Sequence, residues 1–267
     1  MVDTNDAVLV KGCCAAAYSS ELVTLLLGDA YHPGGHTLTR HLADLLELRS
    51  TDRVLDLAAG RGTTALLLAT EYGVHARGLD LSAANVALAR GAALAAGLGD
   101  RVMFVEGDAE RLPYPDSSFD AIVCECALCL FPDKHTAARE MARVLCPGGR
   151  LGLTDITASP DRLPPELRTL TARVACIADA HPLERYADLL TAAGLTITHT
   201  EHHNNAVTRM IDQIEARLHL IRMTAPARAA SLGLDLQATE PVLAAARAAI
   251  VNGSLGYGLI IGRARIR

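Results

Sequence analysis

The sequence predicts an α/β fold with a mostly parallel, doubly wound sheet, and two observations support this prediction. Residues 54–62 form a short apolar run that ends in a glycine turn, and residues 63–71 then repeat apolar residues at helical spacing. Strand-like and helix-like segments go on alternating through residue 155. A buried strand, a glycine turn and a helix make up half of the βαβ unit that binds nucleotides beyond the carboxyl ends of parallel strands.

The glycine turn carries the first candidate ligand contacts. Gly60 and Gly62 let the backbone pass close to a ligand because glycine has no Cβ, and Asp56 can accept a hydrogen bond from an amine or a hydroxyl. A dinucleotide-binding turn has three glycines, but Ala58 stands at the first position and threonines follow at 63–64. The pyrophosphate loop is therefore incomplete, and the turn alone does not identify a ligand.

Acidic residues at the ends of the following strands add specificity. A second predicted strand ends at Asp80, about 20 residues further on, where an acid commonly binds a ribose diol. A third strand, 102–105, leads to Asp108, and a fourth covers 119–123. Because parallel strands end at the same edge of a sheet, we expect these strand ends to converge.

This order of motifs resembles the class I S-adenosylmethionine-dependent methyltransferases, including their later Arg-Val-Leu-x-Pro-Gly-Gly turn at residues 143–149. The resemblance covers roughly residues 40–200 and implies a Rossmann-like methyltransferase fold with S-adenosylmethionine as cofactor and S-adenosylhomocysteine as its product. In it, Asp56 and the two glycines face the methionine end, Asp80 the ribose, and Asp108 the adenine. The full set of cofactor-binding residues that it implies is Asp56, Ala58, Gly60, Gly62, Asp80, Leu81, Asp108, Ala109 and Cys124.

Length and composition restrict the partners. The chain has 267 residues, 50% of them hydrophobic, which suffices for one α/β domain with an accessory region. A net charge of -5 and only 3% aromatic residues argue against a nucleic-acid partner. The start of the sequence lacks a basic and then apolar signal, and no apolar run approaches a membrane span, so we expect a cytoplasmic protein without a membrane partner. The expected substrate is a small molecule or a metalloid, and both monomer and dimer are open.

Three regions are expected. Residues 1–50 form an N-terminal helical cap that begins its first clear helix after Ser20, residues 51–200 form the cofactor-binding domain, and residues 201–267 form a C-terminal helical extension. Further helices are expected at residues 82–96, 134–145, 164–179, 183–193, 206–223 and 241–251, and a strand at 196–200. The sequence shows no internal repeat and no low-complexity linker, so the flanking regions are caps on one domain.

The cysteines bear on the substrate. There are seven, an odd number, so full internal pairing is impossible, and in the cytoplasm most would be reduced. The cluster Cys-Glu-Cys-Ala-Leu-Cys at 124–129 follows the fourth strand, where substrate meets the methyl group in this fold. Thiols there suit a soft, thiophilic centre. A cysteine that is only a small buried hydrophobe is the alternative, and it applies more readily to Cys129 and Cys146 than to Cys126.

The sequence around these thiols resembles the arsenite methyltransferases, which bind trivalent arsenic through cysteines of an N-terminal segment, the loop after strand four and a later helix. Residues 125–134 resemble that family's Asn-Cys-Val-Ile-Asn-Leu-x-Pro-Asp-Lys motif. Three stretches carry cysteines at the family's ligand positions: residues 11–15 with Cys13 and Cys14, residues 125–134 with Cys126, and residues 163–194 with Cys176. The family's Tyr-x-Gly-Cys-Gly region is replaced by residues 29–35, and the region after residue 206 does not match.

The resemblance implies that Cys126, Cys176 and either Cys14 or Cys13 bind As(III) with its lone pair directed at the sulfonium methyl group, so that no general base is required. Holding both reactants in place can supply about 7 to 11 kcal/mol of the barrier. The N-terminal cysteine that is not a ligand could reduce methylated arsenic by forming a disulfide, which would require a thiol reductant. The N-terminal cap is expected to close over the core when arsenic bridges the two.

Two other functions fit the sequence. A small-molecule O-, N- or C-methyltransferase would use a base, and the candidates are His32, Asp155, His181 and Tyr186. A non-catalytic metalloid-binding protein on the same scaffold would bind the ion without consuming cofactor. A zinc site fits less well, because the thiols come from distant segments without the paired spacing of structural zinc sites.

Overall fold

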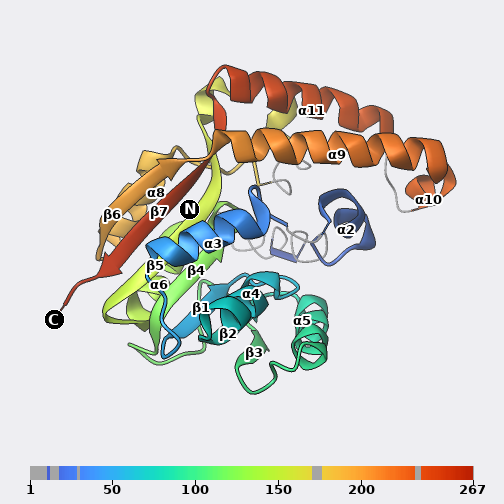
Figure 1. Ribbon diagram of the computed structural model, residues 1–267. Coiled ribbons are helices and arrows are strands. Elements are labelled where there is room, and N and C mark those ends of the chain that lie inside the picture. Colours follow the sequence, from blue (N-terminus) through green and yellow to red (C-terminus); the bar gives the residue numbers. More distant parts are fainter. Residues whose placement is uncertain (1–10, 13–17, 29–30, 170–175, 232–235, 267) are drawn as a thin grey trace.

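A seven-stranded sheet with the order β3-β2-β1-β4-β5-β7-β6 forms the centre of the computed structural model, which describes residues 11–12, 18–28, 31–169, 176–231 and 236–266 (Figure 1). The strands are β1 (Arg53–Leu57), β2 (His75–Asp80), β3 (Val102–Glu106), β4 (Phe119–Glu125), β5 (Leu145–Ala158), β6 (Leu195–His202) and β7 (Leu255–Ala264). Strands β1 to β5 run parallel to one another, whereas β7 is antiparallel to both β5 and β6. The predicted mostly parallel α/β fold is confirmed.

Three of the described helices begin at a capping side chain. Ser20, Ser82 and Asp133 each accept a hydrogen bond from the backbone N–H three residues later, which satisfies one of the free donors of a helix start. The helices are α2 (Glu21–Leu27), α3 (Gly35–Leu45), α4 (Thr63–Tyr72), α5 (Ala83–Ala95), α6 (Lys134–Val144), α8 (Leu183–Ala192), α9 (Asn204–Thr224), α10 (Pro226–Ser231) and α11 (Leu236–Val251).

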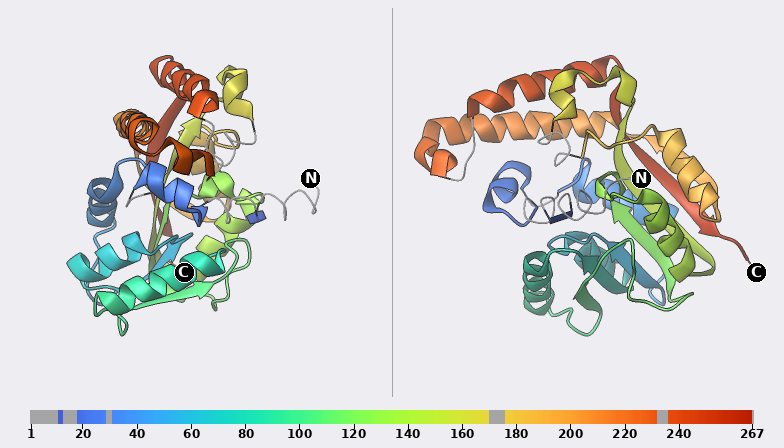
Figure 2. Two further views of the ribbon diagram at one scale, coloured as in Figure 1. Left: turned by 90° about the vertical axis from the view of Figure 1, so that its right-hand side faces the viewer. Right: turned by 180° about the vertical axis from the view of Figure 1, so that it is seen from behind.

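Helices cover both faces of the sheet and bury a separate core on each. On one face, α3 and α4 contribute fully buried residues such as Leu42 and Leu68. On the other face, α6 and α8 contribute Met141 and Tyr186, which are also fully buried. Each such side chain contributes roughly 1.5 to 3 kcal/mol on burial, so the doubly wound arrangement follows from the apolar faces of these helices. Figure 2 shows α9 and α11 packed side by side beyond the sheet.

The C-terminal region is more than a helical extension, because its last strand lies inside the sheet. β7 pairs along its length with β5 on one side and with β6 on the other. The run Leu259-Ile260-Ile261 is buried on both faces, which is typical of an interior strand. At Gly258 a Cβ would lie 2.4 Å from Leu183 Cδ1, so glycine lets α8 approach β7 closely.

The predicted helix over residues 164–179 is not seen in the described part of that segment. Pro165–Arg168 form one short 3-10 turn, and residues 176–177 lie in a turn that leads to Pro182. Residues 170–175 lie outside the described residues. The consecutive prolines at 164–165 favour an extended entry and a short turn over a regular helix at this point.

The strand order reverses between β1 and β4, and the glycine turn follows β1 at that edge. Ala58, Gly60 and Gly62 all have positive φ values, of 60, 54 and 83°. A Cβ at Gly62 would lie 2.4 Å from Phe104 Cζ, so this position requires glycine for both conformation and space. Open α/β sheets bind their ligands at such a switch point.

Candidate active site

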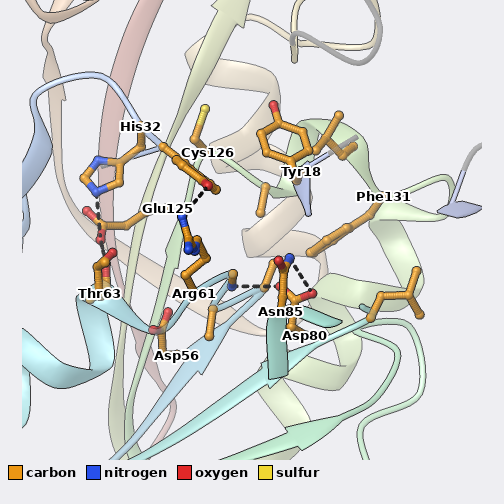
Figure 3. Close-up of a pocket in the computed structure, with 18 of the residues that line it drawn as sticks. Tyr18, His32, Asp56, Arg61, Thr63, Asp80, Asn85, Glu125, Cys126 and Phe131 are labelled. Atoms are coloured by element: carbon orange, nitrogen blue, oxygen red, sulfur yellow. Dashed lines mark hydrogen bonds and ion pairs between the residues drawn. The ribbon is translucent and has the colours of Figure 1, made fainter. Parts of the chain in front are cut away.

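A pocket opens at the carboxyl edge of β1, β2 and β4 and is closed on one side by residues from the N-terminal region (Figure 3). Its lining combines the glycine turn, the ends of β2 and β4, and residues near positions 18 and 32. The lining residues that bear on its chemistry are Lys11, Tyr18, His32, Asp56, Ala58, Gly60, Asp80, Leu81, Asn85, Glu125 and Cys126.

Asp80 connects the glycine turn to the start of α5. Its Oδ2 accepts from Gly60 N at 2.8 Å, and its Oδ1 accepts from Ser82 N at 2.8 Å and from Asn85 Nδ2 at 3.3 Å (Figure 3). The side chain is held rigidly at the pocket wall and keeps lone pairs that can accept from a diol.

Asn85 was not found from the sequence, although the Ser82 capping signal placed it on the first turn of a helix. Its Oδ1 is buried and has no hydrogen-bond partner among the described residues. A buried polar atom without a partner costs about 1 to 3 kcal/mol, so an acceptor aimed at a pocket indicates a ligand with a matching donor.

Three carboxyl groups concentrate negative charge at the inner end of the pocket. Burial, followed by repulsion from Glu125, raises the pKa of Asp56 to about 8, although Ala65 N donates to its Oδ2 at 3.0 Å. Asp80 adds to this repulsion. A cationic ligand would relieve it and restore ionisation of Asp56, so the site fits a ligand that carries positive charge here.

His32 and Glu125 form a buried pair on the pocket wall. His32 Nε2 lies 3.6 Å from Glu125 Oε2, and the two side chains are 7% and 4% exposed. Thr64 Oγ1 donates to Glu125 at 2.7 Å, and Thr39 Oγ1 donates to it at 3.2 Å. The histidine is thus a candidate base with a carboxylate behind it. The other candidate bases, Asp155, His181 and Tyr186, do not line this pocket.

Cys126 and Cys176 lie together, although 50 positions separate them in the sequence. The Cys176 sulfur lies 3.6 Å from the Cys126 carbonyl oxygen and 3.1 Å from the Tyr18 hydroxyl. Both cysteines have positive φ values, 54° for Cys126 and 65° for Cys176. A non-glycine residue in this region is strained, and such strain is concentrated at functional sites.

Hydrogen bonds from the Cys126 and Cys129 thiols hold the pKa of Cys176 well below its usual range, against the effect of complete burial. The same contact with Cys176 is the main reason why the pKa of Cys126 is raised. Among these thiols, Cys176 is therefore the one whose thiolate form is favoured most. Cys129, which the sequence favoured as a packing residue, belongs to this thiol cluster because its side chain contacts Cys176. Its backbone N–H donates to Asp155 Oδ2 at 2.9 Å, which holds the backbone of Cys129 in place.

Cys126, Cys129 and Cys176 do not together form a close three-ligand site. In the described part of the chain, only one trio of His, Cys, Asp or Glu side chains has all its ligand atoms within 4.8 Å of one another, and it lies elsewhere. Cys13 and Cys14 lie outside the described residues. The residues on either side of them do line the pocket: Lys11 Nζ binds Asp108 Oδ2 at 2.7 Å, and Tyr18 contacts Cys176.

The remaining residues assigned to the cofactor lie near the pocket but not in its lining. Asp108 is paired with Lys11, Ala109 is buried in the core against β4, and Gly62 packs on Phe104. Cys124 is fully buried within β4, and burial raises its pKa. Contacts of these residues with a cofactor stay a prediction.

The strand order, the glycine turn at the switch point and the acidic strand ends are those of the Rossmann-like fold of class I methyltransferases. Residues 55–153 match the family described as methyltransferase domain. No helix among the described residues has the length and apolar character needed to cross a membrane.

Relatives of known function are similar over this region. The 27-O-demethylrifamycin SV methyltransferase of Amycolatopsis mediterranei is 43% identical over 123 residues, which are 46% of this chain and 45% of that protein. The demethylmenaquinone methyltransferase of Thermus thermophilus is 39% identical over 122 residues, which are 45% of this chain and 54% of that protein. The chain thus spans about half the length of these relatives.

Solved structures extend the similarity of fold to almost the whole chain. The geranyl diphosphate C-methyltransferase from Streptomyces coelicolor, in complex with S-adenosyl-L-homocysteine, has a TM-score of 0.76 at 16% identity and covers 95% of this chain and 97% of that one. The Haemonchus contortus phosphoethanolamine N-methyltransferase 2, with S-adenosyl-L-methionine, also has a TM-score of 0.76, at 17% identity, and covers 94% of this chain and 57% of that one. At these identities the likeness concerns the fold alone.

Proposed function

We propose that the chain binds S-adenosylmethionine in the pocket at the switch point and transfers a methyl group from this cofactor. The free Asn85 Oδ1 and the anchored Asp80 suit the hydroxyl and amine donors of an adenosine. The carboxyl groups of Asp56 and Glu125 suit the positive charge at the methionine end. When bound, the cofactor supplies an electrophilic methyl group. The chain's own residues orient it and exclude water.

We propose that the acceptor is trivalent arsenic, as arsenite or methylarsenite. The observation that carries this proposal is the contact of Cys126, which lines the pocket, with Cys176 behind it. Packing alone does not explain why two distant cysteines meet with both backbones at positive φ. A thiolate is the form that binds soft ions.

The cluster residues would replace the hydroxides of arsenite. Each sulfur–arsenic bond that forms displaces one hydroxide, which leaves as water. The hydroxide takes its proton from the thiol, or from solvent where the sulfur is already a thiolate. Cys126 and Cys176 supply two sulfurs, and the third comes from Cys13 or Cys14, as the family resemblance implies. The bound arsenic keeps its lone pair, so it needs no base to attack the methyl group. Turnover then requires a thiol reductant for the oxidised product.

The test is a methyl-transfer assay with labelled S-adenosylmethionine. Arsenite, methylarsenite and a panel of phenols are offered separately, each with and without thiol reductant. We expect label in methylated arsenic, sustained only with reductant. Transfer to a phenol with none to arsenic would refute the arsenic acceptor, and stoichiometric arsenic binding without consumption of cofactor would identify a binding protein.

A second candidate is a small-molecule methyltransferase that uses His32 as its base. The buried pair of His32 with Glu125 on the pocket wall favours it, since a carboxylate can orient the imidazole and stabilise its protonated form. The names of relatives such as the 27-O-demethylrifamycin SV methyltransferase and the demethylmenaquinone methyltransferase are compatible with an oxygen or carbon acceptor of this kind.

The two candidates differ in their response to His32→Ala. If His32 is a general base, the rate with a phenol falls by about 10² to 10⁴-fold. With thiol-bound arsenic the arsenite rate should stay close to that of the wild type, because no proton is removed at the methyl-transfer step. Initial rates for both acceptors give the answer, and His75→Ala, an exposed histidine at the start of β2, is the matched control. A similar loss with arsenite would contradict the base-free mechanism.

A further inference from the structure

A group of histidines around one glutamate lies apart from the pocket, where α3, β6 and the start of α9 meet (Figure 1). Glu201 Oε2 lies 2.8 Å from His41 Nε2 and 2.7 Å from His203 Nε2, and Glu201 Oε1 lies 2.6 Å from His199 Nε2. Methyl transfer uses none of these side chains.

The group has the geometry of a metal site. The ligand atoms of His41, Glu201 and His203 all lie within 4.8 Å of one another, and among the described residues no other trio of this kind does so. The side chains are 43%, 25% and 25% exposed, so an ion can reach them from solvent and complete its coordination with water.

The backbone holds these residues from three separate elements. His41 belongs to α3, which Leu42 anchors in the core. Glu201 lies on β6, downstream of the irregularity between Ile197 and His199, and two residues after His199, so that both project from the same side of the strand. His203 is the N-cap of α9, and its N–H donates to Tyr257 O at 2.7 Å. A site assembled in this way is not a flexible surface patch.

We propose that His41, Glu201 and His203 bind one Zn²⁺ ion. Imidazole nitrogens with one carboxylate are a donor set that Zn²⁺ takes at about 2.0 to 2.2 Å, whereas Ca²⁺ and Mg²⁺ prefer oxygen donors alone. In the hydrogen bonds to Glu201, Nε2 is the donor of His41 and of His203. Each ring therefore binds the ion only after its Nε2 proton has moved to Nδ1 or, from a doubly protonated ring, to solvent. The bound ion would link α3 to β6 and to the start of α9.

The site is tested on the full chain with Zn²⁺ alone. At about one hundred times its dissociation constant, Zn²⁺ should raise the melting temperature by about 5 °C, because only the folded chain presents the site. His41→Ala and His203→Ala should each remove this shift. His202→Ala is the matched control, since His202 neighbours Glu201 on β6 but projects to the opposite side, and it should keep the shift.

Cysteine thiolates can also bind Zn²⁺, so Co²⁺ is used to distinguish the histidine group from the thiol cluster. Co²⁺ at the histidine group should show ligand-field bands without the near-ultraviolet charge-transfer band of cobalt–thiolate bonds. Loss of these bands in His41→Ala, with Cys126→Ser unaffected, supports the proposal. Binding that depends on Cys126, or a melting shift that persists in both histidine variants, would overturn it, and so would the absence of any Zn²⁺ effect on the wild type.

Discussion

Cys126→Ser is expected to lower the rate of arsenite methylation by at least about 10²-fold, the size of loss that follows from misplacing a reactant by one ångström. Serine keeps the shape of the side chain but has a hard oxygen that does not hold trivalent arsenic. The variant also removes the thiol that donates to Cys176, so the pKa of Cys176 should rise and less of it will be thiolate. S-adenosylmethionine affinity should be unchanged.

The rate is measured from the methylated arsenic formed, and the affinity by calorimetry. Cys146→Ser is the matched control, because its thiol donates to Ser117 O near the amino ends of the strands and does not line the pocket. Full activity of both Cys126→Ser and Cys176→Ser would exclude thiol-held arsenic and leave the small-molecule methyltransferase.

Asp80→Ala should weaken S-adenosylmethionine binding by roughly 10-fold to 100-fold, the equivalent of losing about 1 to 3 kcal/mol of buried hydrogen bonds. The substitution removes the acceptor for a ribose diol. It also frees Gly60 N and Ser82 N, which Asp80 holds at 2.8 Å, so the glycine turn loses its attachment to α5.

Calorimetry measures this affinity, and circular dichroism shows whether the variant is folded. Asp100→Ala serves as control, since Asp100 is an exposed turn residue before β3 and does not line the pocket. If folded Asp80→Ala binds the cofactor as tightly as the wild type does, the proposed placement of the cofactor is wrong.

The cofactor edge could be predicted from the sequence because each of its signals is local. An apolar run that ends in Gly60 and Gly62, and an acid at the end of the next strand, fix both a conformation and a position within a few residues. The free acceptor of Asn85 could not be predicted, since it depends on how the first turn of α5 lies against Asp80.

Only part of the thiol cluster could be predicted, because its residues come together through contacts between segments that are distant in the sequence. The likeness of three short segments to one family led to the expectation that Cys126 and Cys176 meet, and the structure brings them together. The role of Cys129 depends on the 3-10 turn after β4 and on Asp155 of the neighbouring strand, neither of which a motif encodes. The place of β7 inside the sheet could not be predicted either. An interior strand lacks the alternation of apolar and polar residues that would distinguish it from a buried helix segment.

The most direct test of the central claim is a measurement of which thiols arsenite protects. The wild-type chain is treated with an alkylating reagent with and without arsenite, and the modified cysteines are identified by mass spectrometry. The account predicts that arsenite protects Cys126 and Cys176 together, in the same molecules, while the remote Cys146 is alkylated at the same rate in both samples. Equal alkylation of Cys126 and Cys176 with and without arsenite would contradict it.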